Sequence, residues 1–592
     1  MHQPIVEFTR RQLHSLLSVV DLEKDGKVVQ VDGFRLRKPE ERPNAAVDRS
    51  QGGESGGVSR SASSFQSIRN ASLYEPRIEL IKRQLESLLR VVQLESGGEA
   101  IEVDGFRLRN LKDWLSPSPC DPTEIFGYAG TRCNCDCVFC CNKGNPATLA
   151  LGKLVRPVSE EFAEMMTRLD HFFPKPGYCL FPTLGDIYEV MIHPRFFEVL
   201  ESTRERSAKT FRITTNGECL TRETISRLEK LKPVYLYLSL NSASPSRRAS
   251  LMKSRDPQTA IDSLPLLREA GIPYSLVIVP WPVDSVEEML DDLVDTVAYA
   301  DRNLASLVQV NLAGYSRYFS QEKLYDLDEV WSAVVSAVRG LRETTASPIV
   351  VMPSMYEENT YESRKNAPRV VGVVRNSPAA RSGLMRGDEI VKVGSVVISS
   401  RPQARGLLSV LQGSEIGRAS LTVERAGERV EVTLNVEDFS YPYSPATDHH
   451  LGVIFMGTGL RLSYLESLRG LVNSRDAKHV LFLSSTLVKP TFEQLLAESH
   501  LFGDVRVDIG VPRNSFFGGN IFMGDLLVVQ DFIDFIKEYV KGGGDRPDLV
   551  VIPSTPFSLG GWGRDLTGRV YLDIEREVGI PVELLQCSTI FD

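Results

Sequence analysis

Five of the nine cysteines lie between Cys133 and Cys141, and their spacing can support metal chemistry. The pattern Cys-x3-Cys-x2-Cys occurs once in the chain, at Cys133, Cys137 and Cys140. A loop with this spacing can wrap three thiolates around one face of an iron–sulfur cube and leave the fourth iron with an open coordination position. Because an electron-transfer ferredoxin usually closes that position with a fourth cysteine, an open iron indicates a substrate or cofactor ligand.

Two other readings of these cysteines are less well supported. Structural zinc takes four ligands, commonly as two separated cysteine pairs, and the sequence holds no second Cys-x2-Cys outside this loop. A thioredoxin-like redox pair at Cys137 and Cys140 lacks the active-site proline context and the small domain expected for it. Dense clustering in a large chain with an odd cysteine total fits metal or cluster ligation better than a disulfide framework.

The residues after the cysteines alternate between strand and helix patterns, from about 121 to 342. Helical stretches such as SEEFAEMMTRLDHFF and RETISRLEKLK separate short apolar, β-branched runs, which predicts βαβ units around a buried parallel sheet, as a barrel or an open sheet. The chemistry should then lie at the carboxyl ends of the strands. The strand candidates are GYCLFPTL, TFRITTNG, VYLYLSLNS, YSLVIVPW and LVQVNLAGY.

The cysteine motif, with Phe139 just before its last cysteine and a βα series after it, resembles the signature of the radical S-adenosylmethionine (SAM) superfamily. The resemblance covers about 200 residues and implies an α/β fold with a partial (β/α)6 barrel. It implies that Cys133, Cys137 and Cys140 bind a 4Fe–4S cluster. The residues that it assigns to SAM are Phe139 at the adenine, Gly185 and Asp186 in place of a Gly-Gly-Glu motif, Thr215 and Asn216 in a Thr-Asn-Gly strand end, and Ser239 and Asn241 on the next strand.

The same resemblance implies the reaction. The open iron would chelate the amino and carboxylate groups of SAM, and one electron would cleave the sulfonium C–S bond to give a 5′-deoxyadenosyl radical that abstracts hydrogen from an unactivated C–H. Asp186 is one methylene shorter than the family's glutamate, which leaves its contact with the SAM amino group in question. The additional Cys135 and Cys141 are either passive thiols or serve a second function, as ligands of another metal or as sulfur acceptors.

Two further modules follow the core. Residues 366–438 resemble a bacterial PDZ domain at Ser377-Pro378-Ala379-Ala380 and Gly387-Asp388, an α+β module that either adds a peptide as an extra strand or only packs against its neighbours. No carboxylate-binding Gly-Leu-Gly-Phe loop is evident there. Residues 448–592 resemble the C-terminal αβ accessory domain of iron–sulfur oxidoreductases related to NifB and MoaA. The glycine pair after Phe517 is either a hairpin turn or an anion-binding turn.

The chain opens with a repeat, because residues 11–37 recur at 83–109 with an offset of 72. Each copy predicts a short amphipathic helix followed by an alternating strand, and represents either a duplication or a paired docking module. Residues 39–77 between the copies are rich in Ser, Gly, Arg and Pro, a composition that predicts a disordered linker. The expected units are therefore 1–38, 39–77, 78–115, 116–360 for the radical SAM core, 366–438 and 448–592.

The charge and the hydrophobicity of the sequence argue against some classes of function. The 592 residues carry 68 Lys and Arg against 77 Asp and Glu, a formal charge of −9, which argues against a dedicated nucleic-acid partner. The sequence has no apolar run of about 18 residues and no signal-peptide pattern, so we expect a cytoplasmic protein without a membrane partner.

We therefore expect a radical SAM oxidoreductase with a 4Fe–4S cluster and SAM as cofactors, and a flavodoxin or ferredoxin as electron donor. Two alternatives stay open: a non-catalytic iron–sulfur electron carrier or assembly scaffold, and a peptide-modifying enzyme that uses the PDZ-like module to present its substrate.

Overall fold

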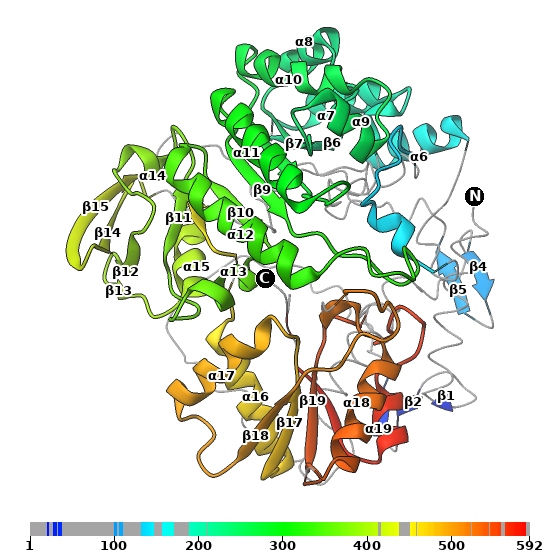
Figure 1. The fold of residues 1–592 in the computed structure, drawn as a ribbon. Coiled ribbons are helices and arrows are strands. Elements are labelled where there is room, and N and C mark those ends of the chain that lie inside the picture. The colour runs from blue at the N-terminus through cyan, green and yellow to red at the C-terminus, as the bar shows by residue number, and fades with distance from the viewer. Residues whose placement is uncertain are drawn as a thin grey trace, which may run out of the picture.

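The structure is a computed structural model of the full chain (Figure 1). The residues that it describes are 21–22, 28–31, 34–37, 100–103, 106–109, 132–146, 157–170, 189–208, 210–412, 416–436, 450–457, 459–521, 524–543, 545–557, 563–585 and 587. The predicted linker 39–77, the predicted helices of the two repeat copies, the strand candidate GYCLFPTL, and Gly185 with Asp186 all lie outside these residues.

Each copy of the N-terminal repeat contains an antiparallel hairpin where the sequence predicts one strand. In the first copy β2 (Val28–Val31) pairs with β3 (Phe34–Arg37), and β1 (Asp21–Leu22) adds to β2. In the second copy β4 (Ala100–Val103) pairs with β5 (Phe106–Arg109). An Asp-Gly pair separates the two strands of each hairpin, which is a favoured sequence for a two-residue hairpin loop.

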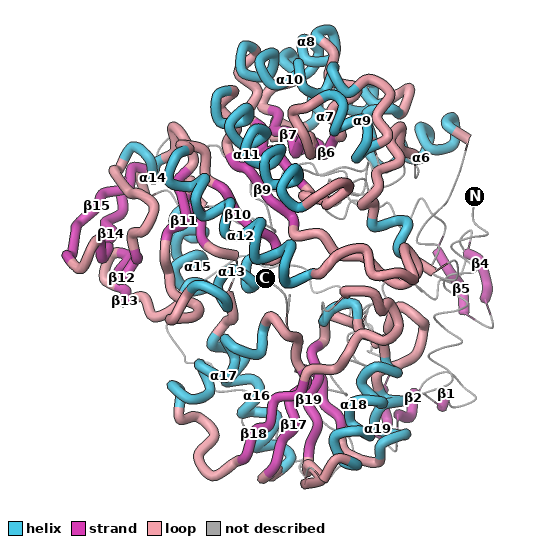
Figure 2. The backbone as a smooth tube through the Cα atoms, viewed as in Figure 1, coloured by secondary structure: helices cyan, strands magenta, loops and turns pink. Residues whose placement is uncertain are grey.

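The core is built on a parallel sheet with the strand order β10-β9-β8-β7-β6. The strands are almost wholly buried, as expected when helices cover a parallel sheet (Figure 2). This arrangement confirms the predicted α/β core with a parallel sheet. The strands are β6 (Phe211–Thr215), β7 (Val234–Ser239), β8 (Tyr274–Ile278), β9 (Leu307–Asn311) and β10 (Ile349–Met352).

The core helices begin where the sequence supplies capping side chains. Thr221, Ser244, Asp256, Ser285 and Asp326 each accept a hydrogen bond from a backbone N–H in the first turn of the helix that follows. The helices are α6 (Val158–Asp170), α7 (Phe196–Arg206), α8 (Arg222–Lys230), α9 (Pro245–Met252), α10 (Pro257–Glu269), α11 (Val286–Arg302), α12 (Leu327–Thr344) and α13 (Ser354–Tyr361), with the 3-10 turns η1 (Cys141–Gly144) and η4 (Val190–Ile192).

The PDZ-like module has an antiparallel sheet in the order β13-β12-β14-β15 and a two-stranded pair of β11 with β16. Its elements are β11 (Val370–Val373), α14 (Pro378–Arg381), β12 (Glu389–Val393), β13 (Val396–Val397), α15 (Arg401–Gln412), β14 (Arg418–Arg425), β15 (Glu428–Asn435) and β16 (Val453–Phe455).

The position of strand β16 differs from the domain assignment expected from the sequence. The sequence places residues from 448 onward in the C-terminal domain, yet Leu451, Val453 and Phe455 are buried in the same hydrophobic cluster as Val370 and Leu408 of the PDZ-like module. The strand lies beyond residue 438 and pairs with β11. A local sequence pattern does not predict a pairing between segments so far apart in the chain. The module is therefore completed by a strand that follows it.

The C-terminal domain has a parallel sheet in the order β18-β17-β19-β20, with helices on both sides of it (Figure 1). Its elements are α16 (Leu462–Arg475), β17 (His479–Leu483), α17 (Val488–Ser499), β18 (Arg506–Gly510), η5 (Gly524–Leu526), α18 (Val529–Lys541), β19 (Leu549–Pro553), α19 (Leu572–Val578) and β20 (Val582–Leu585). Among the helices of the described residues, none has the length and apolar character needed to cross a membrane.

A buried polar junction joins the three units. Glu358 of the core helix α13 forms a bidentate ion pair with Arg401 of α15, at 2.9 and 3.1 Å, and both side chains are 2% exposed. Asn366 donates its backbone N–H to Glu358 and exchanges two side-chain hydrogen bonds with the backbone of Leu460. The core, the PDZ-like module and the start of the C-terminal domain therefore meet at one hydrogen-bonded point.

Candidate active site

The cysteine loop, residues 132–146, is fixed at the carboxyl end of the core sheet. The backbone N–H groups of Asp136 and Val138 donate to the carbonyl oxygens of Met252 and Leu251, at 3.0 and 2.7 Å, at the end of α9. Asn216, directly after β6, donates its side-chain amide to Asn134 of the loop at 2.7 Å and approaches Cys133 Sγ at 3.9 Å. The loop thus lies where parallel α/β proteins place their chemistry.

The five thiols of the loop form two groups. The Cys135 thiol shares hydrogen bonds with those of Cys133 and Cys137, and this sharing raises the pKa of Cys133. Cys140 lies beside Cys141, and the hydrogen bond from Cys141 lowers the pKa of Cys140 to about 6. The loop therefore contains a thiol that readily becomes a thiolate, the form that binds metals.

The donor set fits an iron–sulfur cluster in kind and number. Cys133, Cys137 and Cys140 offer three soft sulfur donors on one short loop. In the part of the chain that the structure describes, no three His, Cys, Asp or Glu side chains converge so as to hold a metal ion. The position of each Sγ depends on one side-chain torsion, whereas the backbone of the loop is fixed by its contacts.

Two carboxylates anchor the cysteine loop from outside. Glu161 of α6, which is fully buried, pairs with Arg132 at 2.7 Å. Glu218, after β6, accepts a hydrogen bond from the Asn134 side chain at 2.6 Å and from the Cys135 thiol at 3.7 Å. Glu218 also accepts from Ser254 and from the backbone of Arg255, so it ties the loop to the segment that follows α9.

A buried carboxylate, Glu189, lies behind the end of β6. It accepts hydrogen bonds from Thr215 Oγ1 at 3.0 Å, from the backbone N–H of Asn216 at 2.5 Å and from that of Met191 at 3.2 Å. Burial raises the pKa of Glu189 to about 7, although these hydrogen bonds act in the opposite direction. Both oxygens of Glu189 are therefore engaged by protein donors, directly behind the strand end that contacts the cysteine loop.

Glu189 was missed by the sequence reasoning, which assigned the amino-binding carboxylate to Asp186. Gly185 and Asp186 lie outside the described residues. The signal that could have identified Glu189 is an acidic residue inside the apolar run Ile187–Ile192, since a lone carboxylate among apolar residues needs a partner.

Ser239 and Asn241, the two residues predicted at the end of β7, have different surroundings in the structure. Asn241 is buried with a φ of 63°, and its amide joins the backbone of Val279 and Ser239 with the sulfur of Met252. These bonds make Asn241 a brace between strand ends. Ser239 is half-buried and remains at the edge of the site.

A second residue missed from sequence is Arg248 of α9. Its side chain is fully buried and donates to the carbonyl oxygens of Ser239, the last residue of β7, and of Leu240, and to that of Asn216 after β6. The guanidinium thus joins the two strand ends that carry the predicted SAM residues. Two adjacent arginines on a short helix gave no sequence signal that distinguished this one.

An aromatic cluster forms one wall beside the cysteine loop. The Phe139 ring lies 6.5 Å from that of Trp281, which in turn contacts Tyr315 at 6.5 Å, Phe319 at 5.7 Å and Tyr325 at 5.4 Å between ring centroids. Cys135 and Cys137 pack against the same cluster. Phe139, predicted to face an adenine, therefore packs the cysteine loop against this apolar wall.

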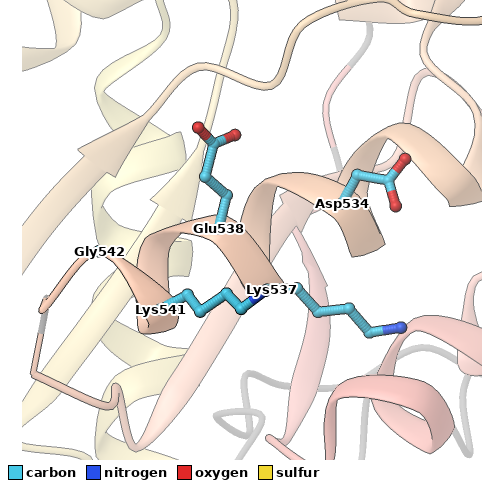
Figure 3. Close-up of a pocket in the computed structure, with 5 residues that line it drawn as sticks. All are labelled: Asp534, Lys537, Glu538, Lys541 and Gly542. Carbon is cyan, nitrogen blue, oxygen red and sulfur yellow. The ribbon is translucent and has the colours of Figure 1, made fainter.

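A hollow in the C-terminal domain differs from this site. Figure 3 shows it beside α18, lined by Asp534, Lys537, Glu538, Lys541 and Gly542. All five belong to one helix or the residue after it, and the charges alternate in sign along an exposed helix face. This hollow holds no buried functional group.

Comparison with known proteins identifies two domains. Residues 128–295 match the radical SAM superfamily, and residues 358–436 match the PDZ domain family. No curated protein matches the chain. The first match covers the cysteine loop and the strands β6 to β8, and the second covers the PDZ-like module except β16.

Solved structures of SuiB from Streptococcus suis are similar to parts of the chain. The structure bound to S-adenosylmethionine is 18% identical over 38% of this chain and 49% of SuiB, with a TM-score of 0.29. A second is 14% identical over 51% and 61%, with a TM-score of 0.30, and one bound to precursor peptide SuiA is 16% identical over 46% and 61%, with a TM-score of 0.28. The chain thus spans about half to three fifths of the length of SuiB.

Proposed function

The protein carries a radical SAM domain and a PDZ domain, and from that premise we propose that it is a radical SAM oxidoreductase. A 4Fe–4S cluster and SAM are the cofactors of such a domain, and when bound they supply reductive cleavage of SAM to a 5′-deoxyadenosyl radical that takes hydrogen from a substrate. Cys133, Cys137 and Cys140 are the residues that would hold the cluster.

The observation that carries the proposal is the contact of Asn216 with both the cysteine loop and Glu189. Asn216 donates its side chain to Asn134 and its backbone N–H to Glu189, at 2.7 and 2.5 Å. A protein that only stored or relayed electrons would need the thiols but not a buried carboxylate beside them. We propose Glu189 as a partner of the SAM ammonium group, in place of or together with Asp186. Its two oxygens accept from Thr215, Asn216 and Met191, so the ammonium group would replace one of these donors.

The other residues of the site position the strand ends and shield the cysteine loop from water. Arg248 and Asn241 hold the ends of β6, β7 and β8 in register through backbone hydrogen bonds. Trp281 and its aromatic neighbours exclude water from the side of the cysteine loop, which protects a reactive radical from side reactions. Thr215 is buried and holds Glu189 in place, and Ser239 lies at the edge of the site.

The test compares the reduced cluster with and without SAM. The chain is reconstituted anaerobically with iron and sulfide, reduced with dithionite, and examined by electron paramagnetic resonance before and after SAM is added. We expect the spectrum to change because SAM binds at the open iron. A four-iron cluster whose spectrum is indifferent to saturating SAM would favour the electron carrier or assembly scaffold.

A second candidate function, modification of a peptide, is favoured by the PDZ family match over residues 358–436. PDZ domains bind an extended peptide as an additional strand at a sheet edge, so this module could present a peptide substrate to the core. Retention of a peptide library by the full chain, and modification of a retained peptide by the reconstituted, reduced protein with SAM, would support this function. A chain that retains no peptide would count against it.

We further propose a flavodoxin or ferredoxin as electron donor and the cytoplasm as location. The clustered free cysteines support a reducing compartment. Reduction of the reconstituted cluster by a flavodoxin system, without dithionite, tests the first of these.

A further inference from the structure

We propose that the C-terminal domain completes the wall of the candidate active site, with Asn520 as the positioning residue. Two segments form the contact between the domains. The docking loop is residues 514–521 of the C-terminal domain, and the wall segment is residues 313–319, which follow β9 of the core. The proposal deepens the proposed function, since the wall segment borders the cysteine loop. Nothing in either family match assigns a role to residues beyond 436.

The two segments are joined by three hydrogen bonds, two of them between backbone groups. The Asn520 N–H donates to the Tyr315 carbonyl at 3.0 Å, and the Tyr315 N–H donates to the side-chain oxygen Oδ1 of Asn520 at 2.6 Å. Two residues further along, the Arg317 N–H donates to the Phe517 carbonyl at 2.8 Å. Both backbone groups of Tyr315 are thus bonded by one residue of another domain, once through its backbone and once through its side chain.

The glycine pair of the docking loop is explained by this contact. Gly518 and Gly519 both have positive φ values, 58° and 60°. A Cβ on Gly519 would lie 2.2 Å from the Tyr315 carbonyl oxygen and 2.9 Å from the carbonyl carbon of Ser316. Only glycine allows this backbone to approach so closely in this conformation. The pair therefore serves close packing on the wall segment.

The docking loop is held rigid by its own domain. Asp531, in the first turn of α18, accepts hydrogen bonds from the backbone of Ser515 and Phe516 at 2.9 and 3.3 Å and from that of Val528 at 3.1 Å. Asn514 bonds the Phe517 N–H and the Leu526 carbonyl, both at 2.9 Å. A preorganised loop of this kind can transmit the position of α18 to whatever it contacts.

On its other side the wall segment contacts the cysteine loop. Ser316 Oγ donates to the Gly144 carbonyl at 2.5 Å. The Tyr315 ring lies 5.3 Å from Tyr325 and 6.5 Å from Trp281, which contacts Phe139. The docking loop is therefore separated from the cysteine loop by a single layer of residues, and loss of its hydrogen bonds should loosen both segments.

The experiment measures hydrogen exchange in the full chain without iron or SAM. The test variant is Asn520→Ala, which leaves the Tyr315 N–H without its acceptor. Asn520→Asp keeps an oxygen at Oδ1 and serves as the rescue variant. The matched control is Arg513→Ala, an exposed position one residue before the docking loop. Gly519→Val, which forces the loop away, is the strong variant.

In Asn520→Ala we expect exchange to accelerate at least about fivefold in residues 313–319 and also in 132–146, the scale set by one lost buried hydrogen bond. Asn520→Asp and Arg513→Ala should exchange like the wild type. After reconstitution, Asn520→Ala and Gly519→Val should lose iron to a chelator faster by a similar factor, with four irons per chain at the start.

Faster exchange confined to residues 514–521, with 313–319 and 132–146 unchanged in both Asn520→Ala and Gly519→Val, would overturn the proposal. The exchange measurement needs no cofactor, so it decides the matter even if the chain fails to bind SAM. Conversely, a chain that cleaves SAM normally in both variants with unchanged exchange would leave the proposed function intact and refute this role of the C-terminal domain.

Discussion

Replacing Glu189 by Gln should weaken SAM binding while making the folded protein more stable at alkaline pH. Both effects would follow from the burial of an ionisable carboxylate, because its charged form is costly when no cation lies beside it. Glu189 is 3% exposed, and its pKa is raised from 4.5 to about 7. At about 1.4 kcal/mol per pKa unit, the ionised side chain costs roughly 3 kcal/mol above pH 7.

The sign of the pH dependence follows from the raised pKa. The folded protein holds the Glu189 proton more tightly than the unfolded chain does, so the free energy of unfolding falls as pH rises from about 4.5 to about 7. Gln removes this dependence and keeps one acceptor oxygen for Thr215 or Asn216. The gain at pH 8 should therefore be somewhat below the full 3 kcal/mol, as measured by urea unfolding of metal-free protein at pH 5 and pH 8.

The loss in affinity is set by a charge-assisted contact. Removing such a contact with the SAM ammonium costs about 1.5–3 kcal/mol, which is roughly a 10- to 150-fold rise in Kd. Titration calorimetry on anaerobically reconstituted protein measures it, with Asp186→Asn as the paired variant. If Asp186→Asn alone raises Kd, the ammonium partner is Asp186, and unchanged affinity in both variants would refute the reasoning about this side of the site.

Three further outcomes are expected. Asp525→Asn should stabilise the protein at pH 8 by up to about 3 kcal/mol, because burial raises the pKa of Asp525 to about 6 and its cost appears between pH 4 and pH 6; equal unfolding midpoints at pH 8 would contradict this. Cys137→Ala should empty the cluster or leave a damaged three-iron form, whereas Cys135→Ser should keep about four irons per chain, and iron and sulfide analysis of both variants decides. Arg401→Ala should destabilise the chain by about 3–5 kcal/mol because it leaves Glu358 buried without its partner, and Glu358→Gln in the same background should recover part of that loss in urea unfolding.

Sequence patterns predicted the elements that are continuous in the chain. The apolar runs around Ile213, Leu236, Leu276 and Val308 each form a buried strand, and the strand ends meet the cysteine loop as expected. Periodicity is informative here because a buried parallel strand is apolar on both faces. The short run before Pro353, which forms β10, was not among the predicted strands, since four residues give little pattern to read.

Features that depend on contacts between distant segments could not be predicted in this way. Strand β16 joins a module from which it is separated by many residues. Glu189 is held by hydrogen bonds from Thr215 and Asn216, which lie 26 and 27 positions away in the chain. The glycine pair at 518–519 looked like a turn because its partner, Tyr315, lies 205 positions from Asn520. Local propensity carries no information about such partners.

We propose that the chain cleaves SAM reductively at the cysteine loop. The most direct measurement is the yield of 5′-deoxyadenosine and methionine from anaerobically reconstituted, dithionite-reduced protein with SAM, beside an identically treated Cys137→Ala variant. We expect both products in equal amounts from the wild type, as slow turnover even without substrate, and neither from the variant. Methylthioadenosine as the product, or no cleavage by wild-type protein carrying four irons per chain, would contradict the account.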